Sequence, residues 1–593
     1  MARSKKAILQ DLMDLGLTPG GANKAYAVYG VHASSYVRRD PYQLLLLYER
    51  PPWEEIERVA AKVGMPPSAP ERIAGAIVYS LAAATSDGHV YLPQRELYQR
   101  AYRHLGFYDE SALQNSMDEL CGNRLVFLTG KEEDGASPAY LYPLYTAERT
   151  IAHLMTQLFV CSSRMALKAP SEKEMKQVEE EMRIRFAPAQ REAISASLEN
   201  KIVIITGGPG TGKTTIVRGV LHLWEQRGAK MLLAAPTGRA ARRLAESSGR
   251  KASTIHRLLE YSQEAQQFNR NAERKLSVDL LVVDEVSMIE TELMAAMLEA
   301  LPPAAHLLLV GDVNQLPAVG PGLVLHDLIE CKKFKTILLS EIFRQGESSL
   351  ISFNAQKINQ GQLPDLSGAG IEGGQDFYFV NRPNDLDAKS AILEMAVNRI
   401  PRQMGLNPKK DVQVLCPMIK KEVGVEKMNE ALQECLNPAP LRVKTPFYSL
   451  AVGDKVMQTK NDYSKDVFNG DIGIVCDIHP KNLQAIIVFD GVEVRYDWLE
   501  LENTALAYAI TVHKSQGGEY RAVLIPLSMQ HYPMLQRNLL YTAVSRGKEM
   551  VILVGSPRAL EIAVRNNKIR KRYTGLKHWL EEAFRSVSAA KGT

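Results

Sequence analysis

An α/β fold built on two parallel sheets is what this 593-residue sequence predicts. Short apolar runs carry the prediction in two groups, one between residues 186 and 345 and one between residues 412 and 554. Apolar runs of this length are typical of strands that are buried on both faces of a parallel sheet. A glycine-rich loop directly after the first run is the third observation, because open α/β sheets bind ligands at that place.

The N-terminal part has a mostly helical pattern. Residues Leu15–Tyr26 predict a helix, a glycine hairpin and a second helix, and we assign residues 1–85 to this helix-hairpin-helix region. A winged-helix-like region, residues 86–170, begins around Asp87–Gln94. The charged segment from Ser171 to about Arg185 predicts a connecting helix.

The first predicted nucleotide-binding domain spans residues 171–345. Its expected strands are Ile202–Ile205, Met231–Ala235, Leu280–Val283, His306–Val310 and Ile337–Leu339. The polar segment Tyr261–Leu276 has no core pattern and predicts a short projecting hairpin.

The second predicted domain comprises residues 346–445 and 504–593. Its expected strands are Val412–Cys416, Val523–Leu527 and Val551–Val554. Residues 446–503 interrupt it with short β segments, which predict a small barrel-like insertion. These segments are Lys455–Gln458, Ile472–Val475, Ala485–Phe489 and Val492–Tyr496. Asn469-Gly470 and Asp490-Gly491 are turn signals.

Composition narrows the class of protein only weakly. A net charge of +5 favours polyanionic partners slightly. The six cysteines form no C-x-x-C pair, which argues against a zinc site or a disulfide framework. No apolar leader and no apolar stretch of membrane-spanning length are found, so we expect a soluble cytoplasmic protein without a membrane partner.

Residues Gly207 to Thr215 form the most specific motif. Gly207, Gly212, Lys213 and Thr214 have the G-x-x-x-x-G-K-[ST] spacing of a phosphate-binding loop. Glycines let backbone N–H groups close around a phosphate, and the following helix N-terminus adds unpaired donors. Lys213 is expected to reach the β- and γ-phosphates, and the Thr214 hydroxyl to ligate Mg²⁺.

Polar residues follow two further runs of the first domain. Asp284 and Glu285 end the run Leu280–Val283, where Asp284 is expected to hold Mg²⁺ and Glu285 to deprotonate the attacking water. Gln315 follows His306–Val310 and is placed to sense the γ-phosphate. These residues predict hydrolysis of a nucleoside triphosphate.

Two arginines in motif-like segments are candidates to act across a cleft. They are Arg344, in Ile342-Phe-Arg344, and Arg546, in Leu540–Arg546. An arginine supplied by a facing sheet stabilises transition-state charge only when the cleft closes. Closure coupled to hydrolysis would produce motion.

Seven motifs in order resemble those of superfamily 1 helicases, specifically the stand-alone RecD-type DNA helicases of the 5′-to-3′ group. They are Gly207–Thr215, Ala235–Ala241, Val282–Met288, Gly311–Pro317, Ile342–Arg344, Ala509–Glu519 and Leu540–Arg546. The resemblance covers residues 186–556 and implies two RecA-like motor domains, ATP and Mg²⁺ as cofactors, and an SH3-like insertion.

The resemblance also implies site residues. The positions that match ATP contacts are Gln190, Gly208, Pro209, Gly210, Thr211, Gly212, Lys213, Thr214, Thr215 and Glu519, with Gln190 reading adenine and Glu519 contacting the ribose. The positions that match strand contacts are Pro236, Thr237, Arg239, Thr254, His256, Thr511, His513, Lys514 and Ser515. An isolated Thr or His is also common as a helix cap or a core residue.

The implied activity is ATP-dependent 5′-to-3′ unwinding in DNA repair or recombination. The implied partners are single-stranded DNA and its junctions with duplex DNA. The protein is expected to bind them as a monomer. Gln315–Gly320 lacks the base-stacking aromatic residue of the 3′-to-5′ branch, and Tyr261–Leu276 matches the strand-splitting pin. A RecD subunit of a multi-subunit exonuclease and a non-unwinding, ATP-gated DNA-binding scaffold remain alternatives.

Two further segments, one in the N-terminal region and one near the C-terminus, indicate a function less specifically than the motifs do. Leu47–Trp53 contains two prolines where the family has a glycine hairpin, and proline has no N–H to give a phosphate. A structural platform is therefore at least as plausible as DNA contact for residues 30–80. The basic tail Arg565–Arg572 favours a solvated helix face over a DNA contact.

Overall fold

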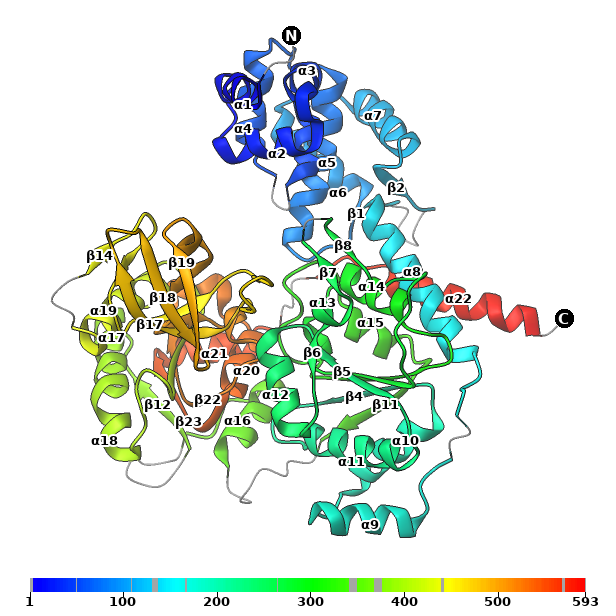
Figure 1. The fold of residues 1–593 in the computed structure, drawn as a ribbon, viewed down its shortest axis with the longest axis vertical. Helices are drawn as coiled ribbons and strands as arrows, with labels where there is room; N and C mark the ends of the chain where they lie inside the picture. The colour runs from blue at the N-terminus through cyan, green and yellow to red at the C-terminus, as the bar shows by residue number, and fades with distance from the viewer. Residues whose placement is uncertain are drawn as a thin grey trace.

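The computed structural model describes residues 4–48, 51–107, 109–130, 137–165, 168–263, 265–340, 349–366, 376–438, 442–567 and 571–591. Two parallel sheets form two lobes that lie side by side (Figure 1). A helical N-terminal region stands on the first lobe, and a small antiparallel β structure is attached to the second. The predicted α/β class with two parallel sheets is confirmed.

The N-terminal region is a bundle of short helices. They are α1 Lys5–Asp14, α2 Pro19–Tyr29, α3 Ala33–Arg39, α4 Trp53–Lys62 and α5 Pro70–Ser86. The α1–α2 hairpin turns at Gly16, whose φ of +108° suits glycine alone. Glu55 of α4 accepts hydrogen bonds from the Thr18 N–H (2.8 Å) and hydroxyl (3.0 Å). These two bonds attach the turn of the hairpin to α4.

A three-stranded sheet of order β1-β3-β2 joins this bundle to the first lobe. The elements of this part are β1 Tyr91–Pro93, α6 Gln94–Leu105, α7 Glu110–Gly122, β2 Val126–Leu128, β3 Pro138–Leu141 and α8 Tyr142–Val160. The long helix α8 leaves the small sheet and packs on the first lobe.

The first lobe contains a parallel sheet of order β11-β4-β10-β9-β5-β6. Its strands are β4 Ile202–Gly207, β5 Met231–Ala235, β6 Ser253–Thr254, β9 Leu280–Val283, β10 His306–Gly311 and β11 Lys335–Leu339. Its helices are α9 Glu172–Met182, α10 Pro188–Glu199, α11 Lys213–Gln226, α12 Gly238–Ser248, α13 Ile255–Leu258, α14 Thr291–Ala300 and α15 Val324–Glu330. All five predicted runs are strands.

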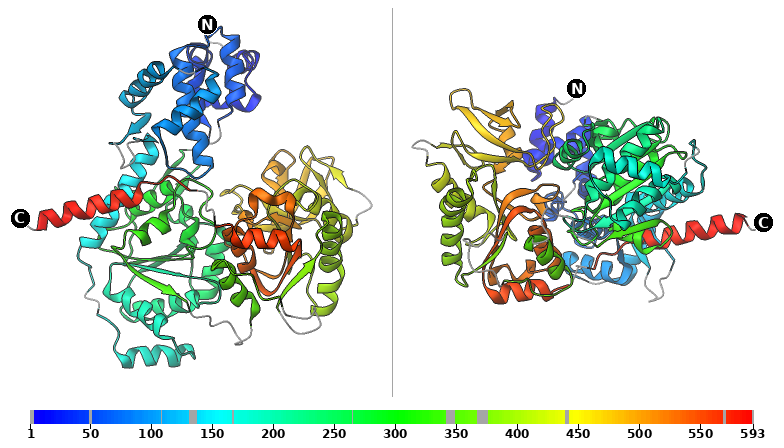
Figure 2. Two further views of the ribbon diagram at one scale, coloured as in Figure 1. Left: turned by 180° about the vertical axis from the view of Figure 1, so that it is seen from behind. Right: turned by 90° about the horizontal axis from the view of Figure 1, so that it is seen from below.

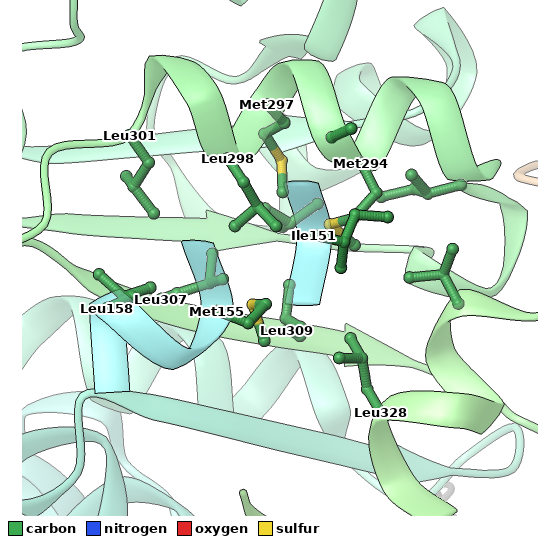
Figure 3. Packing of buried hydrophobic residues seen from close by; sticks show 14 of the residues in the cluster. Ile151, Met155, Leu158, Met294, Met297, Leu298, Leu301, Leu307, Leu309 and Leu328 are labelled. Atoms are coloured by element: carbon green, nitrogen blue, oxygen red, sulfur yellow. The ribbon is translucent and has the colours of Figure 1, made fainter. Parts of the chain in front are cut away.

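One face of this sheet carries the largest core (Figure 3). Ile151, Met155 and Leu158 of α8 interleave with α14 and α15 over the β10 side chains Leu307 and Leu309. These side chains are almost fully removed from water. Burial of apolar area on this scale fixes α8 to the sheet, because each such side chain contributes about 1.5–3 kcal/mol.

The second lobe contains a parallel sheet of order β12-β23-β22-β13-β21. Its strands are β12 Phe377–Asn381, β13 Val412–Cys416, β21 Ala509–Thr511, β22 Tyr520–Leu527 and β23 Gly547–Gly555. Its helices are α16 Leu350–Asn359, α17 Asp385–Glu394, α18 Ile400–Met404, α19 Val425–Leu436, α20 Arg537–Ser545 and α21 Pro557–Arg565. The sequence predicted three of these strands; β12 and β21, both at sheet edges, were missed.

The insertion is an antiparallel sheet of order β19-β18-β17-β16-β20 with its own small core. Its strands are β16 Lys455–Gln458, β17 Ile472–His479, β18 Gln484–Phe489, β19 Val492–Asp497 and β20 Thr504–Leu506, preceded by the pair β14 Val443–Lys444 and β15 Ser449–Leu450. Asp490 and Gly491 both have positive φ, as the predicted two-residue turn requires.

The C-terminal helix α22 Leu576–Lys591 does not belong to the second lobe. Leu576, Trp579, Leu580 and Phe584 pack with α8 and α15 in the core of the first lobe, and the helix projects from that side (Figure 2). Our assignment of residues 504–593 to the second lobe is therefore wrong for this helix. Its apolar side chains could pack on either lobe, and the sequence does not indicate which one. Within the described residues, no helix has the length and apolar character needed to cross a membrane.

Candidate active site and nucleic-acid interface

The glycine-rich loop connects β4 to α11. Gly210 and Gly212 have φ of +76° and +81°, a region that glycine adopts readily, and Gly212 is the N-cap residue of α11. A Cβ on Gly207 would lie 2.9 Å from the Leu339 carbonyl oxygen, so this position cannot carry a side chain. Lys213 Nζ donates to the carbonyl oxygens of Gly207 (2.6 Å) and Gly208 (2.8 Å), which holds its charge at the loop.

Gln190 lies behind this loop at the start of α10. Its buried amide donates to the Thr211 carbonyl oxygen at 3.4 Å, and its Oε1 accepts from the Ala187 N–H at 3.1 Å. The residue predicted to read the base is thus held against the phosphate-binding loop.

Asp284 and Glu285 follow β9, next to the loop. Burial, followed by the Glu285 charge, raises the pKa of Asp284 to about 6. Glu285 is in the left-handed region at φ +52°, and its N–H donates to Asp284 Oδ1 at 2.8 Å. This strained backbone aims two adjacent carboxylates at the same end of the sheet.

The donor set fits Mg²⁺. A carboxylate from Asp284 and a hydroxyl from Thr214 are oxygen ligands of the kind that this ion prefers. No cluster of three His, Cys, Asp or Glu side chains able to hold a metal occurs in the part of the chain that the structure describes. Mg²⁺ needs no such cage, since it keeps waters and takes ligands from phosphates.

Arg243 of α12 is a residue that sequence reasoning missed. Its guanidinium lies 3.5 Å from Glu285 Oε1 and 3.1 Å from Glu519 Oε1, which links the acidic pair of the first lobe to the second lobe. Lys548 also pairs with Glu519 at 3.2 Å. Arg242 and Arg243 directly follow the motif Ala235–Ala241, and no local signal distinguishes one from the other. The Glu519 contact with ribose remains a prediction.

A buried polar network crosses the boundary between the lobes. Tyr541 of α20 donates to Asp312 Oδ2 at 2.7 Å, and Gln315 Nε2 donates to the same oxygen at 3.2 Å. Arg546 donates to Gln315 Oε1. Burial raises the pKa of the Asp312 carboxyl. The predicted Gln315 and Arg546 therefore meet, whereas Arg344 lies outside the described residues.

The backbone of Leu316 is also bound by the second lobe. Its N–H donates to Thr542 Oγ1 at 2.9 Å, and its carbonyl oxygen accepts from Gln516 Nε2 at 2.8 Å. If the second lobe moves relative to the first, the loop after β10 must therefore move with it or lose these two hydrogen bonds.

The predicted strand-contacting residues divide into two groups. The hydroxyls of Thr237 and Thr254 cap helices, and the buried Ser515 hydroxyl donates to the Val512 carbonyl oxygen at 2.7 Å. These three are engaged by backbone, the structural role that the sequence left open. Thr511 Oγ1 likewise accepts from the Lys514 N–H at 3.2 Å. The others differ: Arg239 donates to Tyr520 Oη across the lobes at 2.8 Å, Lys514 is exposed, and Pro236 and His513 are half-buried.

The predicted hairpin is present as β7 Tyr261–Ser262 and β8 Gln267–Phe268. His256 packs beside its base, with ring centroids 5.6 Å from those of both Tyr261 and Phe268. Tyr463 of the insertion lies 6.2 Å from Tyr261. The hairpin and the insertion thus meet close to His256, one of the predicted strand-contacting residues.

A phosphate-binding loop, an acidic pair and an arginine from a second lobe define the class of two-lobed P-loop enzymes that bind nucleoside triphosphates. An ATP-dependent RecD2 DNA helicase from Deinococcus radiodurans is 33% identical over 572 residues, covering 94% of this chain and 76% of its own. This chain belongs to the RecD2 family of ATP-dependent DNA helicases.

Four family profiles match successive parts of the chain. They describe the ATP-dependent RecD2 DNA helicase HHH domain at residues 1–91, an AAA domain at 190–321, the ATP-dependent RecD-like DNA helicase SH3 domain at 428–489 and a UvrD-like helicase C-terminal domain at 506–554. The predicted helix-hairpin-helix and SH3-like modules are confirmed.

Two further similarities are looser. The RecBCD enzyme subunit RecD from Mycolicibacterium smegmatis is 31% identical over 427 residues, covering 66% of this chain and 75% of its own. A Pif1 helicase from Bacteroides, solved with ADP-AlF3 and ssDNA, is 20% identical with a TM-score of 0.40, covering 62% of this chain and 92% of its own.

Proposed function

We propose that this helicase moves 5′ to 3′ along single-stranded DNA and separates duplex ahead of it. The observation that supports the proposal best is the network across the lobes, in which Arg546 donates to Gln315 and Tyr541 to Asp312. Because both lobes contribute to one nucleotide site, binding and hydrolysis at that site change the distance between them.

In the proposed reaction, Lys213 and the N–H groups of the glycine-rich loop bind the phosphates. Thr214 and Asp284 would hold Mg²⁺, which when bound would supply positive charge against the phosphates. Glu285 orients and deprotonates the attacking water. Arg546 stabilises the charge of the transition state. Gln315 of the first lobe accepts a hydrogen bond from Arg546 and so connects this arginine to the first lobe.

The strand is proposed to cross both lobes at the end of the sheets where α12, α13 and residues 511–515 lie. Arg239 and Lys514 supply positive charge there, while Thr511 and His513 border the second lobe. Backbone contacts of this kind dominate single-strand binding.

The direction rests on the family resemblance and on the loop Gln315–Gly320, which has no aromatic residue to stack a base. The hairpin β7–β8 stands at the edge of the proposed track, where it splits the duplex. Opening one base-pair step costs about 1.4 kcal/mol, so a blunt wedge that advances by single steps is sufficient. DNA repair or recombination is the proposed setting, and a monomer the proposed active form.

The deciding experiment compares 5′-tailed, 3′-tailed and blunt duplexes with and without ATP. We expect unwinding of the 5′-tailed duplex alone, and only with ATP and Mg²⁺. Unwinding confined to 3′-tailed duplexes would refute the direction.

A role as the RecD subunit of a larger exonuclease is the alternative, since such subunits are 25–32% identical to this chain. The HHH module at residues 1–91 supports the stand-alone form. Gel filtration of the pure protein followed by the unwinding assay separates the two, because a subunit would need partners.

A further inference from the structure

Arg243 of α12 lies between carboxylates that belong to different lobes. One terminal nitrogen of its guanidinium is 3.5 Å from Oε1 of Glu285 in the first lobe, and the other is 3.1 Å from Oε1 of Glu519 in the second. Burial lowers the pKa of Arg243, but the charges of Glu519, Glu285 and Asp284 outweigh burial and raise this pKa above its ordinary value. Arg243 is therefore a cation with an acidic partner on each side of the lobe boundary.

The backbone of the second lobe comes very close to α12 at this point. A Cβ on Gly517 would lie 2.7 Å from Oγ1 of Thr237, the N-cap residue of α12, and a Cβ on Gly518 would lie 2.7 Å from Nη1 of Arg239. Gly517 also has a φ of +73°, which glycine adopts readily. Two glycines in succession thus bring the next residue, Glu519, within reach of α12.

Glu519 is ionised at this position. Burial alone would raise the pKa of its carboxyl, but the charges of Arg243, Lys548 and Arg546 together hold that pKa below its ordinary value. Lys548 Nζ is 3.2 Å from Glu519 Oε2, so each carboxylate oxygen has a cation beside it. Arg546 is the arginine that donates to Gln315. The Glu519 carboxylate therefore lies in the field of both Arg243 and the proposed transition-state arginine.

Two carboxylates that face each other across a closing boundary repel. Closure brings Glu519 towards Glu285 and removes water from between the lobes, and both changes strengthen the repulsion. The guanidinium of Arg243 stands between the two groups and replaces one repulsive contact by two attractive ones. Its fork of N–H donors suits this task, because it can serve two carboxylates at once.

We propose that Arg243 is a positioning residue for ATP hydrolysis, which allows the lobes to close with Glu519 beside Glu285. The inference rests on the proposed function, in which Glu285 is the base, and it gives α12 a part in the reaction. Arg243 acts through the two carboxylates. Its removal should therefore disfavour the closed arrangement, and removal of the Glu519 charge should make Arg243 dispensable.

The test is a double-mutant cycle on Arg243 and Glu519 in the full chain. Arg243→Ala, Glu519→Gln and the double variant are compared with the parent for two properties. One is kcat of ATP hydrolysis with saturating oligothymidylate, and the other is the dissociation constant of a non-hydrolysable ATP analogue with Mg²⁺.

We expect Arg243→Ala to lower kcat at least about tenfold and to weaken analogue binding at least about threefold, because both depend on closure and like charges oppose it. In the Glu519→Gln background, the same substitution should change each property by less than about twofold, because the repelling charge is already gone.

Arg242→Ala is the matched control. Arg242 is the adjacent arginine of α12, and it pairs with Asp490 and, at 3.8 Å, with Asp471 of the insertion. The substitution removes the same charge from the same helix and leaves the acidic residues of the nucleotide site untouched. Arg242→Ala should keep the kcat and the analogue affinity of the parent, and thermal unfolding of all variants checks the fold.

Two results would overturn the proposal. One is a kcat of Arg243→Ala that matches that of Arg242→Ala. The other is an equal effect of Arg243→Ala with and without the Glu519 charge, which is what a purely structural role in α12 produces. Parent-like hydrolysis by Glu285→Gln would instead refute the site assignment in the proposed function.

Discussion

At the scale of single residues, the active site depends on positions where few side chains are possible. Gly207 has no room for a Cβ, and Glu285 adopts a positive φ that places its carboxylate beside that of Asp284. Asp284 is half-buried, and Arg243 of α12 balances the charge of the acidic pair. The chemistry therefore rests on geometry that the surrounding strands enforce.

The first prediction concerns these residues. Lys213→Ala and Glu285→Gln should each lower ATP turnover at least about 100-fold, because one removes the phosphate-binding cation and the other the base. Binding of single-stranded DNA should persist. Steady-state ATPase and anisotropy assays measure the two properties.

Lys230→Ala, an exposed lysine of the same lobe, is the control for charge and should retain full turnover. Parent-like ATP hydrolysis by either active-site variant would show that the site is assigned wrongly.

At the scale of elements, α12 connects three parts of the molecule. Arg239 bonds Tyr520 of the second lobe, Arg242 pairs with Asp490 and Asp471 of the insertion, and Arg243 pairs with Glu285 and Glu519. Spacings of three and four residues place these arginines on neighbouring sides of one helix. A change in lobe position must therefore move or break contacts of this helix.

The hairpin β7–β8 yields the second prediction. Deleting residues 262–274 should keep DNA-stimulated ATPase and abolish strand separation, because the wedge is lost while the motor remains. Paired ATPase and unwinding assays on a 5′-tailed duplex measure this.

Thermal unfolding serves as the check on folding, since the deletion also removes Arg270 and Arg274, the partners of Glu260. Unwinding at the parent rate would mean that the hairpin is only a surface loop, as in the scaffold alternative.

At the scale of the whole molecule, the chain crosses the lobe boundary again after α21 and anchors on α8. Thr574 Oγ1 lies 2.9 Å from Glu148 Oε1 and 2.6 Å from Asp327 Oδ2, and the Gly575 N–H donates to Glu148 at 3.1 Å. One hydroxyl hydrogen cannot serve both carboxylates, so a proton on Glu148 completes the arrangement. Burial raises the pKa of Glu148 to about 8.

The third prediction follows from this pKa. The folded state holds a proton on Glu148 up to about pH 8, whereas the unfolded chain releases it near 4.5. The associated stability is therefore present below pH 4.5 and is lost as pH rises to about 8. Glu148→Gln cannot ionise, so its melting temperature relative to the parent should rise between pH 6 and pH 9.

Glu582→Gln, in an exposed pair with Arg149, is the control and should show a difference that does not change with pH. A constant offset between Glu148→Gln and the parent across this range would contradict a buried, protonated Glu148.

Local patterns determined much of this protein. The buried runs, the glycine-rich loop and the Asp490-Gly491 turn specify their structures through residues that are adjacent in the chain, and such patterns are legible in one sequence. The family motifs assigned Gln315 and Arg546 to one predicted ATP site, and the structure brings these two side chains into contact.

Only the tertiary structure decided which distant groups share a contact. Arg243 with Glu285 and Glu519, Tyr541 with Asp312, and α22 with α8 join positions that are tens to hundreds of residues apart. An arginine, a tyrosine or an amphipathic helix fits many partners equally well, so local chemistry leaves the choice open. Packing of the lobes selects one partner, because only in the folded molecule are the charges desolvated and the apolar faces covered.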